Sequence, residues 1–482
     1  MNVLFVSSEA VPFAKTGGLA DVVGSLPKAL RKLDVDARVI MPAYAVIDKG
    51  KYNIQHMFSF PFPRRTGTVD VHVYTTVWDT IPFYFVQGWP YFGQESQIYD
   101  GWSLDVDRFI FLNQVAMAVA WEMRQRHGWF PNIFHVNDWH TGLIPFLLYE
   151  SRFDPVWSKV ASLLTIHNMA YQGNDAGGWF WQQGIPGRHQ PDLVYQDLTD
   201  NMLAIGLAYA DLITAVSPRY AIEIQFPFMG YGLQGLVRTR PQDVYGILNG
   251  IDMDHLNPAT DPKITTNYSV SDFEDRRIGN KRQLQADLGL ATKDDVPIIG
   301  LVSRLDPQKG IDLAVPALRR LLESTNMQFI GLGTGNPDLN HELWRIGADF
   351  PERARTFITY DGELAQRIYA GSDVFLMPSH YEPCGIGQMI AMRYGSLPLV
   401  RETGGLADTV ANYDNGPADV GTGFVFNWTE PEALLNTINW ALGTYHNHRD
   451  AWVRMQERGM STDFSWDKSA RQYVDLYHKI IR

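Results

Sequence analysis

Short apolar runs alternate with amphipathic segments along almost the whole chain. This pattern is typical of a parallel β-sheet whose strands are joined by crossover helices. In the first half it predicts strands at residues 3–6, 37–41, 133–136, 163–166, 212–215 and 244–248, and helices at residues 19–32, 106–126 and 141–151. In the second half it predicts strands at residues 298–301, 328–331, 356–358, 374–377 and 397–400, and helices at residues 310–322, 337–346, 363–370, 386–394 and about 465–481. The chain is therefore expected to be an α/β protein with a parallel sheet in each half.

The first half departs from this pattern between residues 54 and 87. Apolar and polar residues alternate there in the stretches 69–77 and 82–86. Such alternation predicts strands with one buried and one exposed face. We therefore expect a local antiparallel insertion in an otherwise parallel sheet.

The two halves meet near residues 249–252, which are followed by a stretch rich in Pro, Asp and Thr. Two domains are the default for a chain of 482 residues, because one hydrophobic core is rarely this large. We expect Rossmann-like domains at residues 1–250 and 251–460. Residues 461–482 hold the final helix, which packs back on the N-terminal domain or caps the other half.

Composition and charge narrow the range of partners. The net charge of −12 argues against nucleic acid or an anionic membrane as the main partner, because both bind basic surfaces. The one cysteine, Cys384, excludes an internal disulfide and fits a reducing compartment. Residues 1–6 read as a strand rather than a basic leader, and no apolar run reaches the length of a membrane span. We expect a soluble, cytoplasmic protein.

One six-residue string, Thr-Gly-Gly-Leu-Ala-Asp, occurs at residues 16–21 and again at residues 403–408. In both copies paired glycines precede an apolar, helix-forming stretch. Such a turn presents free N–H groups and a helix dipole to an anion. The alternative is a pair of tight turns that need the backbone freedom of glycine. Two identical copies favour a phosphate-binding cleft shared by two similar domains.

Two loops in the second half carry charged groups directly after predicted strands, where parallel sheets bind ligands. Arg304 and Lys309 suit a diphosphate, because they combine a planar fork with a point charge. Glu382 precedes a turn through Gly385 and Gly387 whose amides suit phosphate, while the carboxylate accepts ribose hydroxyls. The alternatives are solvated surface charges and a carboxylate that only caps the next helix.

In the first half, Asp138 and His167 each follow a predicted strand. Polar groups at one edge of a sheet suit the hydroxyls of a sugar, although a single His more often serves as a structural hydrogen-bonding group. The glycine run at residues 331–335 resembles a dinucleotide fingerprint but lacks the acidic residue that such a site needs. No His and Cys residues have metal-ligand spacing, so we expect neither a metal nor another cofactor.

These motifs together resemble those of the bacterial glycogen and starch synthases, and the resemblance spans essentially the whole chain. The matching motifs are residues 15–21, 214–218, 249–252, 303–310, 382–388 and 403–408. The family (glycosyltransferase family 5) contains retaining enzymes of the GT-B type, with two Rossmann-like domains facing a central cleft. The resemblance implies transfer of glucose from ADP-glucose, or UDP-glucose in some members, to the non-reducing 4-OH of an α-1,4-glucan.

The resemblance also implies roles for residues at matching positions. The implied catalytic residues are Lys15, Asp138, His167, Arg304, Lys309 and Glu382. The implied donor-binding residues are Lys15, Gly17, Gly18, Asn249, Arg304, Lys309, Tyr360, Glu382, Cys384, Gly385, Ile386, Gly387, Thr403, Gly404 and Gly405. The three cations hold the diphosphate, Glu382 binds the ribose and Tyr360 packs on adenine. Asp138 and His167 face the transferred glucose.

The implied chemistry is electrostatic. Cations and helix N-termini stabilise the charge on the nucleoside diphosphate as it leaves, without a metal. Retention commonly uses a nucleophilic carboxylate, but none is clearly placed for that here. We expect the acceptor to attack the face that the diphosphate leaves, with the leaving phosphate as the base. The implied partners are the nucleotide sugar and the glucan, with no nucleic acid and no membrane, and the oligomeric state is left open.

Two stretches depart from related enzymes. Ile390 stands where related retaining transferases carry a second Glu, which glycogen synthases generally lack too. Ala204 stands where the family typically has a Lys, and residues 174–191 are unusually rich in Trp, Gln and Gly. Two other functions therefore stay open: a related GT-B glucosyltransferase with a different acceptor, and a catalytically weak homologue that binds glucan or nucleotide sugar.

Overall fold

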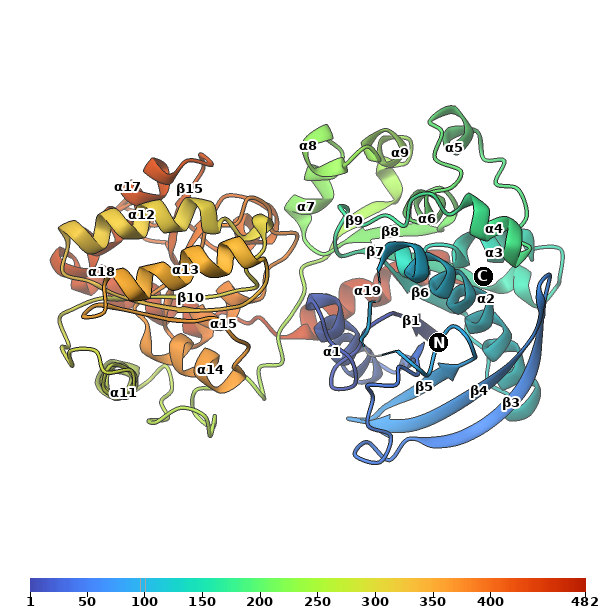
Figure 1. The fold of residues 1–482 in the computed structure, drawn as a ribbon, viewed down its shortest axis with the longest axis horizontal. Coiled ribbons are helices and arrows are strands. Elements are labelled where there is room, and N and C mark those ends of the chain that lie inside the picture. Colours follow the sequence, from blue (N-terminus) through green and yellow to red (C-terminus); the bar gives the residue numbers. More distant parts are fainter. Residues whose placement is uncertain (96, 100) are drawn as a thin grey trace. The chain divides into compact units, whose positions relative to one another are not determined.

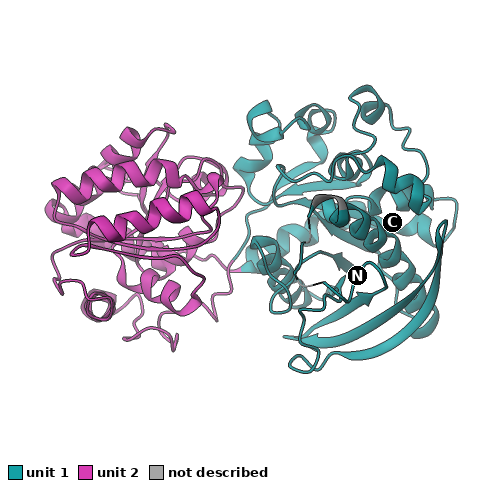
Figure 2. Cartoon of the chain, viewed as in Figure 1, with its two compact units in different colours: residues 1–250, 466–482 teal, residues 251–465 magenta. Residues whose placement is uncertain are grey.

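The structure is a computed structural model that describes residues 1–95, 97–99 and 101–482. The chain forms two compact units (Figure 2). The first contains Met1–Gly250 together with Trp466–Arg482, and the second contains Ile251–Ser465. Each unit is built on a mainly parallel sheet flanked by helices (Figure 1), as the hydrophobic pattern predicts.

The first unit contains a nine-stranded sheet. Its strands are β1 (Asn2–Val6), β2 (Asp36–Pro42), β3 (Gln55–Arg64), β4 (Gly67–Trp78), β5 (Ile81–Gln87), β6 (Ile133–Asn137), β7 (Ala161–Ile166), β8 (Leu212–Ala215) and β9 (Val244–Gly246). The order is β3-β4-β5-β2-β1-β6-β7-β8-β9. β4 is antiparallel to β3 and β5, and the other neighbours are parallel. The predicted antiparallel insertion is confirmed, and it forms one end of the sheet.

The first unit contains six short helices between residues 177 and 238 that the hydrophobic pattern does not predict, and one predicted helix differs in extent. The helices of this unit are α1 (Gly18–Arg31), α2 (Trp102–His127), α3 (Ile144–Glu150), α4 (Gly177–Gln183), α5 (Pro191–Tyr195), α6 (Met202–Tyr209), α7 (Pro218–Glu223), α8 (Pro227–Gly230), α9 (Gln234–Arg238) and α19 (Trp466–Ile480). In place of one helix at residues 141–151, the chain forms a 3-10 turn at Trp139–Thr141 and restarts as α3. Asn113 on α2 holds this restart, because its side-chain oxygen accepts the amides of Leu143 and Ile144, each at 3.0 Å.

The second unit contains a six-stranded, fully parallel sheet. Its strands are β10 (Ile298–Val302), β11 (Gln328–Leu332), β12 (Ala354–Phe357), β13 (Val374–Met377), β14 (Leu397–Arg401) and β15 (Phe424–Phe426), in the order β12-β11-β10-β13-β14-β15. Its helices are α10 (Phe273–Arg276), α11 (Ile278–Asp287), α12 (Ile311–Ser324), α13 (Pro337–Asp349), α14 (Gly362–Gly371), α15 (Gly387–Arg393), α16 (Gly404–Thr409), α17 (Pro431–Asn447) and α18 (Arg449–Ser461). All five predicted strands are present. The pattern does not predict β15, which is only three residues long.

The central strands are apolar on both faces because helices cover both sides of a parallel sheet. Every residue of β7 and of β11 is buried. The flanking helix α12 buries Ile311, Leu318 and Leu321, which recur at helical spacing, in the core of the second unit. This regular burial is why the hydrophobic pattern predicts most elements correctly.

The final helix, α19, returns to the first unit. Tyr477 on α19 is hydrogen-bonded to the His135 ring on β6 at 2.6 Å, and Ser469 donates to the Leu248 carbonyl at 2.5 Å. The chain therefore crosses from the first unit to the second and back again. None of the helices in the described residues is both long and apolar enough to cross a membrane.

The strand order of each sheet reverses once. In the first unit the reversal lies between β1 and β6, and in the second it lies between β10 and β13. At such a point the loops after the two strands lead toward opposite faces of the sheet, and open α/β sheets bind their ligands there. The two reversal points therefore define where the functional side chains are to be sought.

Candidate active site

Glu9 and the turn that carries Lys15 follow β1, at the reversal point of the first sheet. Glu9 is buried, and one of its carboxylate oxygens accepts the amides of Thr16 at 2.5 Å and Gly17 at 3.0 Å. The Lys15 ammonium is paired with Asp21 on α1 at 2.7 Å. The turn predicted to bind phosphate therefore already holds two of the chain's own carboxylates, one on its amides and one on its ammonium.

The structure brings Asp138 and His167 together, after the neighbouring strands β6 and β7. The Asp138 carboxylate accepts the amides of His167 at 2.6 Å and Asn168 at 3.3 Å. The His167 ring is hydrogen-bonded to the side-chain oxygen of Asn137 at 2.9 Å, and the Asn137 amide group donates to the Val6 carbonyl at 3.1 Å. These bonds tie together the carboxyl ends of β1, β6 and β7.

The backbone at Asp138 is unusual. Its φ of +53° lies in a region that side-chain-bearing residues rarely adopt. The Asp138 amide donates to the Thr165 carbonyl at 2.9 Å, which helps to hold this conformation. Strained residues of this kind cluster at functional sites.

Burial shifts the pKa values of Asp138 and of the two histidines near it away from their ordinary values. Burial, with a smaller contribution from the charge of Glu9, raises the pKa of Asp138 to about 7, against the lowering effect of hydrogen bonds from the His167 and Asn168 amides. Burial lowers the pKa of His140 and of His167 to about 3. At neutral pH both rings are uncharged and the carboxyl is poised between its two forms. Perturbations of this size are typical of active sites.

In the second unit Lys309 and Glu382 contact each other, although the resemblance assigns them to different parts of the donor. Their side chains form an ion pair at 2.6 Å, and only 17% and 7% of each is exposed. The Ser379 hydroxyl donates to the same carboxylate oxygen at 3.1 Å. Gln308 donates to the Tyr381 carbonyl at 3.1 Å. The loops after β10 and β13 therefore meet at the reversal point of the second sheet.

Arg304 lies in the same loop as Lys309 but is exposed. Its side chain forms no hydrogen bond or ion pair with any residue that the structure describes, so its guanidinium is free to bind a ligand. Tyr360, in the turn before α14, is 84% exposed. Both residues follow strands of the same sheet, β10 and β12.

The second copy of the repeated string packs against the turn that follows Glu382. A Cβ atom on Gly404 would lie 2.0 Å from the Glu382 carbonyl oxygen, and one on Gly405 would lie 2.1 Å from that of Cys384. The Gly405 amide donates to the Glu382 carbonyl at 3.1 Å. Gly385 has a φ of +73°, which also requires glycine. Close backbone packing thus accounts for these glycines, and the Gly405 amide is not free for a phosphate.

The remaining predicted residues lie at element ends or are buried. Gly18 and Gly387 begin α1 and α15, Ile386 and Thr403 precede α15 and α16, and Cys384, Thr403 and Asn249 are buried. The side-chain oxygen of Asn249 has no hydrogen-bond partner among the described residues. It is therefore a buried acceptor that the described part of the chain leaves unsatisfied.

The structure also shows where the residues that depart from the family pattern lie. Ala204 is fully buried in the first turn of α6, where its amide donates to the Asn201 side chain at 2.8 Å. Residues 174–191 include α4, on which Trp181 is 70% exposed. Ile390 lies in α15.

Sequence reasoning missed three residues of the first site: Glu9, Tyr99 and His140. Tyr99 donates to Glu9 at 2.6 Å, and its ring stacks on that of His140 with centroids 5.4 Å apart. The signal for Glu9 was present, because it is an acidic residue shortly after a buried strand, as Asp138 is. Tyr99 could not be found this way, since it reaches the site from a position 90 residues away.

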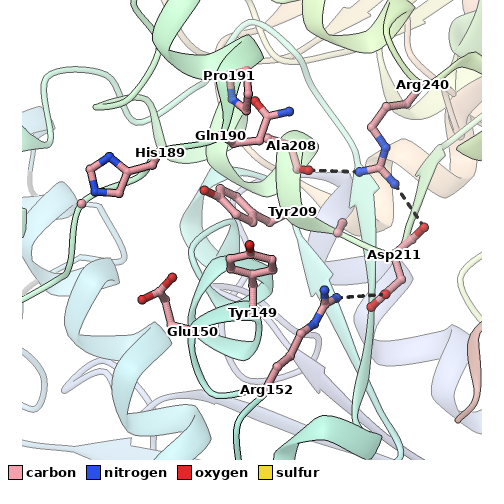
Figure 3. Close-up of a pocket in the computed structure, with 12 residues that line it drawn as sticks. Tyr149, Glu150, Arg152, His189, Gln190, Pro191, Ala208, Tyr209, Asp211 and Arg240 are labelled. Carbon is pink, nitrogen blue, oxygen red and sulfur yellow. Dashed lines mark hydrogen bonds and ion pairs between the residues drawn. The ribbon is translucent and has the colours of Figure 1, made fainter.

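A cavity of about 540 Å³ lies at the opposite, amino-terminal edge of the first sheet, at the start of β8 (Figure 3). The rings of Tyr149 and Tyr209 lie beside each other there, with centroids 5.1 Å apart. The charged groups of the cavity are largely paired. The Asp211 carboxylate forms an ion pair with Arg152 at 3.5 Å, and the Asp211 backbone carbonyl accepts from Arg240 at 3.3 Å. None of the predicted site residues lines this cavity.

Comparisons with known proteins match the whole chain. A family model described as the starch synthase catalytic domain matches residues 2–239, and one described as glycosyl transferases group 1 matches residues 286–458. The glycogen synthases of Syntrophotalea carbinolica and Thermotoga petrophila are 42% and 41% identical, each match covering 100% of this chain and 99% of the relative. The solved catalytic domain of starch synthase IV from Arabidopsis thaliana, bound to ADP and acarbose, is 31% identical. Its TM-score is 0.90, with 100% of this chain and 99% of that one covered.

Replacing Asp138 with Asn is expected to stabilise the protein at pH 8 but not at pH 4. Between the ordinary pKa of 3.8 and the folded-state value of about 7, the folded chain keeps a proton that the unfolded chain releases. Wild-type stability therefore falls as the pH rises through this window, by up to about 4 kcal/mol at 1.4 kcal/mol per pKa unit. Thermal unfolding of both proteins across this range measures the difference, and the histidines titrate alike in both. A difference in stability between the two proteins that does not change with pH would contradict the raised pKa of Asp138.

Replacing Lys309 with Met is expected to destabilise the second unit by about 3 kcal/mol, because it leaves the Glu382 carboxylate buried without its cation. The double variant Lys309→Met, Glu382→Gln should recover most of this loss, since no charge is then left unpaired. Urea unfolding of the two single variants and the double variant measures the coupling. Additive losses would mean that the ion pair contributes nothing.

Proposed function

Since the chain belongs to the bacterial glycogen and starch synthase family, we propose that it transfers glucose from ADP-glucose to the non-reducing end of an α-1,4-glucan, with retention of configuration. The family consists of retaining glucosyltransferases with the GT-B fold. The observation that carries the proposal is the match to glycogen synthases over the full length of both units.

We assign the donor to the second unit. Arg304 is exposed and free, and Lys309 lies in the same loop, so the two supply positive charge for a diphosphate. Tyr360 presents an exposed ring for a nucleobase. The ADP bound by the starch synthase IV relative supports adenine.

We assign the transferred glucose to Asp138 and His167 in the first unit. A neutral imidazole and a carboxyl near its titration midpoint both donate and accept hydrogen bonds, which is what sugar hydroxyls require. Two backbone amides already bind one Asp138 oxygen. This supports a hydrogen-bonding role for Asp138 rather than a nucleophilic one.

The proposed transfer needs no covalent enzyme intermediate. The bond from the glucose C1 to the diphosphate oxygen breaks, the bond from C1 to the acceptor O4 forms on the same face, and the leaving phosphate takes the hydroxyl proton. Lys15, Arg304 and Lys309 stabilise the charge that develops on the diphosphate. Lys15 and Lys309 are paired with Asp21 and Glu382, so a diphosphate would use the remaining N–H groups of each ammonium or compete with these carboxylates.

We further propose that these cations take the place of a metal ion. Among the described residues, no three His, Cys, Asp or Glu side chains are grouped as metal ligands. Independence from added metal stays a prediction, as does the cytoplasmic location.

The variants Lys15→Ala and Arg304→Ala are expected to lower kcat/KM for ADP-glucose by about 10²–10³-fold, the usual cost of removing a group that stabilises transition-state charge. Labelled ADP-glucose and UDP-glucose, each with and without glycogen, measure nucleotide release and glucan labelling separately. The matched control is Arg320→Ala, which removes an exposed arginine paired with Glu432 on α17, outside the site.

The two labels separate the alternatives. Nucleotide release without glucan labelling would show a working donor site with a different acceptor. Residues 174–191, which include the exposed Trp181, would then be tested for acceptor binding. Tight nucleotide binding with no transfer to any glucan would show a catalytically weak homologue. Full activity of Arg304→Ala would contradict the assigned donor site.

A further inference from the structure

Glu9 is a buried carboxylate that is held by hydrogen-bond donors of the chain. One oxygen accepts the Thr16 and Gly17 amides, and the other accepts the Tyr99 hydroxyl at 2.6 Å. Glu9 forms no ion pair with the residues that the structure describes. An anion in such a place is unfavourable unless it is fully hydrogen-bonded, so its position at the reversal point of the sheet calls for a functional explanation.

Glu9 connects the two parts of the first site. On one side it fixes the amides of Thr16 and Gly17, directly after Lys15. On the other side its negative charge acts on Asp138 and disfavours ionisation of that carboxyl. One carboxylate therefore binds the Lys15 turn and, second to burial, also disfavours ionisation of Asp138.

The rings of His140, His167 and Tyr99 carry no charge at neutral pH. Burial lowers the pKa of His140 and of His167 to about 3. Burial also raises the pKa of Tyr99 well above its ordinary value. The Lys15 ammonium is occupied by Asp21. The charge of Glu9 is thus not offset by these neighbours.

We propose that Glu9 is a positioning residue for glucosyl transfer, which holds the Lys15 turn in shape and places a negative charge after β1, the strand that pairs with the one preceding Asp138. The proposal rests on the function given above, in which Lys15 binds the donor diphosphate and Asp138 binds the transferred glucose. This charge adds to the effect of burial in keeping the Asp138 carboxyl protonated to a higher pH, and a protonated carboxyl donates a hydrogen bond to a sugar hydroxyl.

Two substitutions separate the two roles of Glu9. In Glu9→Gln the side-chain oxygen still accepts the Thr16 and Gly17 amides, while its NH₂ group donates to the Tyr99 hydroxyl, so the geometry is kept and the charge is lost. In Glu9→Ala both the hydrogen bonds and the charge are lost. Glu150→Gln and Glu150→Ala are the matched controls, because Glu150 is an exposed acid at the opposite edge of the same sheet.

The kinetic test follows kcat and KM for ADP-glucose with glycogen as acceptor. Glu9→Ala is expected to lower kcat/KM by about 30-fold or more, mainly through kcat, because the Lys15 turn is no longer held. Glu9→Gln should stay within about 5-fold of the wild type, and the Glu150 variants should not change. Wild-type kcat/KM in Glu9→Ala overturns the proposal. The proposal is also overturned if Glu9→Ala has a lowered unfolding temperature and regains wild-type kcat/KM when it is assayed below that temperature. The loss of activity would then reflect lost stability alone.

A second test does not depend on activity. The test follows the infrared C=O band of the protonated Asp138 carboxyl as the pH is changed. The band is isolated by subtracting the spectrum of an Asp138→Asn variant, once in the wild-type background and once in the Glu9→Gln background. We expect the midpoint to move to lower pH by roughly half a unit or more in Glu9→Gln, because a like charge has been removed. An unchanged midpoint overturns the electrostatic role.

The two tests also separate this proposal from the proposed function. A wild-type protein that transfers no glucose to any glucan contradicts the function, yet the infrared titration still tests the link between Glu9 and Asp138. If Glu9→Ala does not fold, the titration of Glu9→Gln decides in the same way.

Discussion

The candidate site residues of each unit depend on a single reversal of strand order in its sheet. The first sheet reverses between β1 and β6, and the second between β10 and β13. The loops after these strands carry Glu9, Asp138, Arg304 and Glu382. Because loops at a reversal point lead to opposite faces of a sheet, they leave the strand ends accessible to a ligand. The buried helices and strands serve mainly to fix these few loop residues in place.

The carboxylates at these positions are each held by direct hydrogen bonds or an ion pair. Asp138 and Glu9 are bound by backbone amides, while Glu382 is bound by Lys309. In the first unit this leaves a buried acid whose pKa is raised to about 7, next to two neutral histidines. In the second unit it leaves Arg304 as an exposed cation in the loop after β10. The first unit thus suits the hydroxyls of a sugar and the second suits a phosphate.

Much of this could be predicted from the sequence, because buried parallel strands are apolar over their whole length. The antiparallel insertion and the terminal helix were likewise visible as changes of hydrophobic period. The helix expected at residues 141–151 was wrong in extent, since Asn113, on another helix, sets where α3 begins. Spacing along the sequence carries no information about such contacts.

The site was only partly predictable for the same reason. Residues that directly follow strands, such as Asp138 and Arg304, could be found from position alone. The pairing of Lys309 with Glu382 joins residues 73 positions apart, and the Tyr99 contact with Glu9 joins residues 90 apart. The repeated Thr-Gly-Gly-Leu-Ala-Asp string suggested two phosphate-binding turns. The amides of Gly17 and Gly405 are instead bonded within the chain, and this became visible only with the fold.

The most direct test of the account is the chemical position of the transferred glucose. Glycogen is incubated with the purified protein and ADP-[¹⁴C]glucose, and the labelled polymer is digested with an exo-enzyme that releases maltose from the non-reducing ends of α-1,4 chains. The account predicts that nearly all of the label is released as maltose at the start of digestion. Label that stays in the undigested polymer, or that appears only as free glucose before digestion, would contradict it.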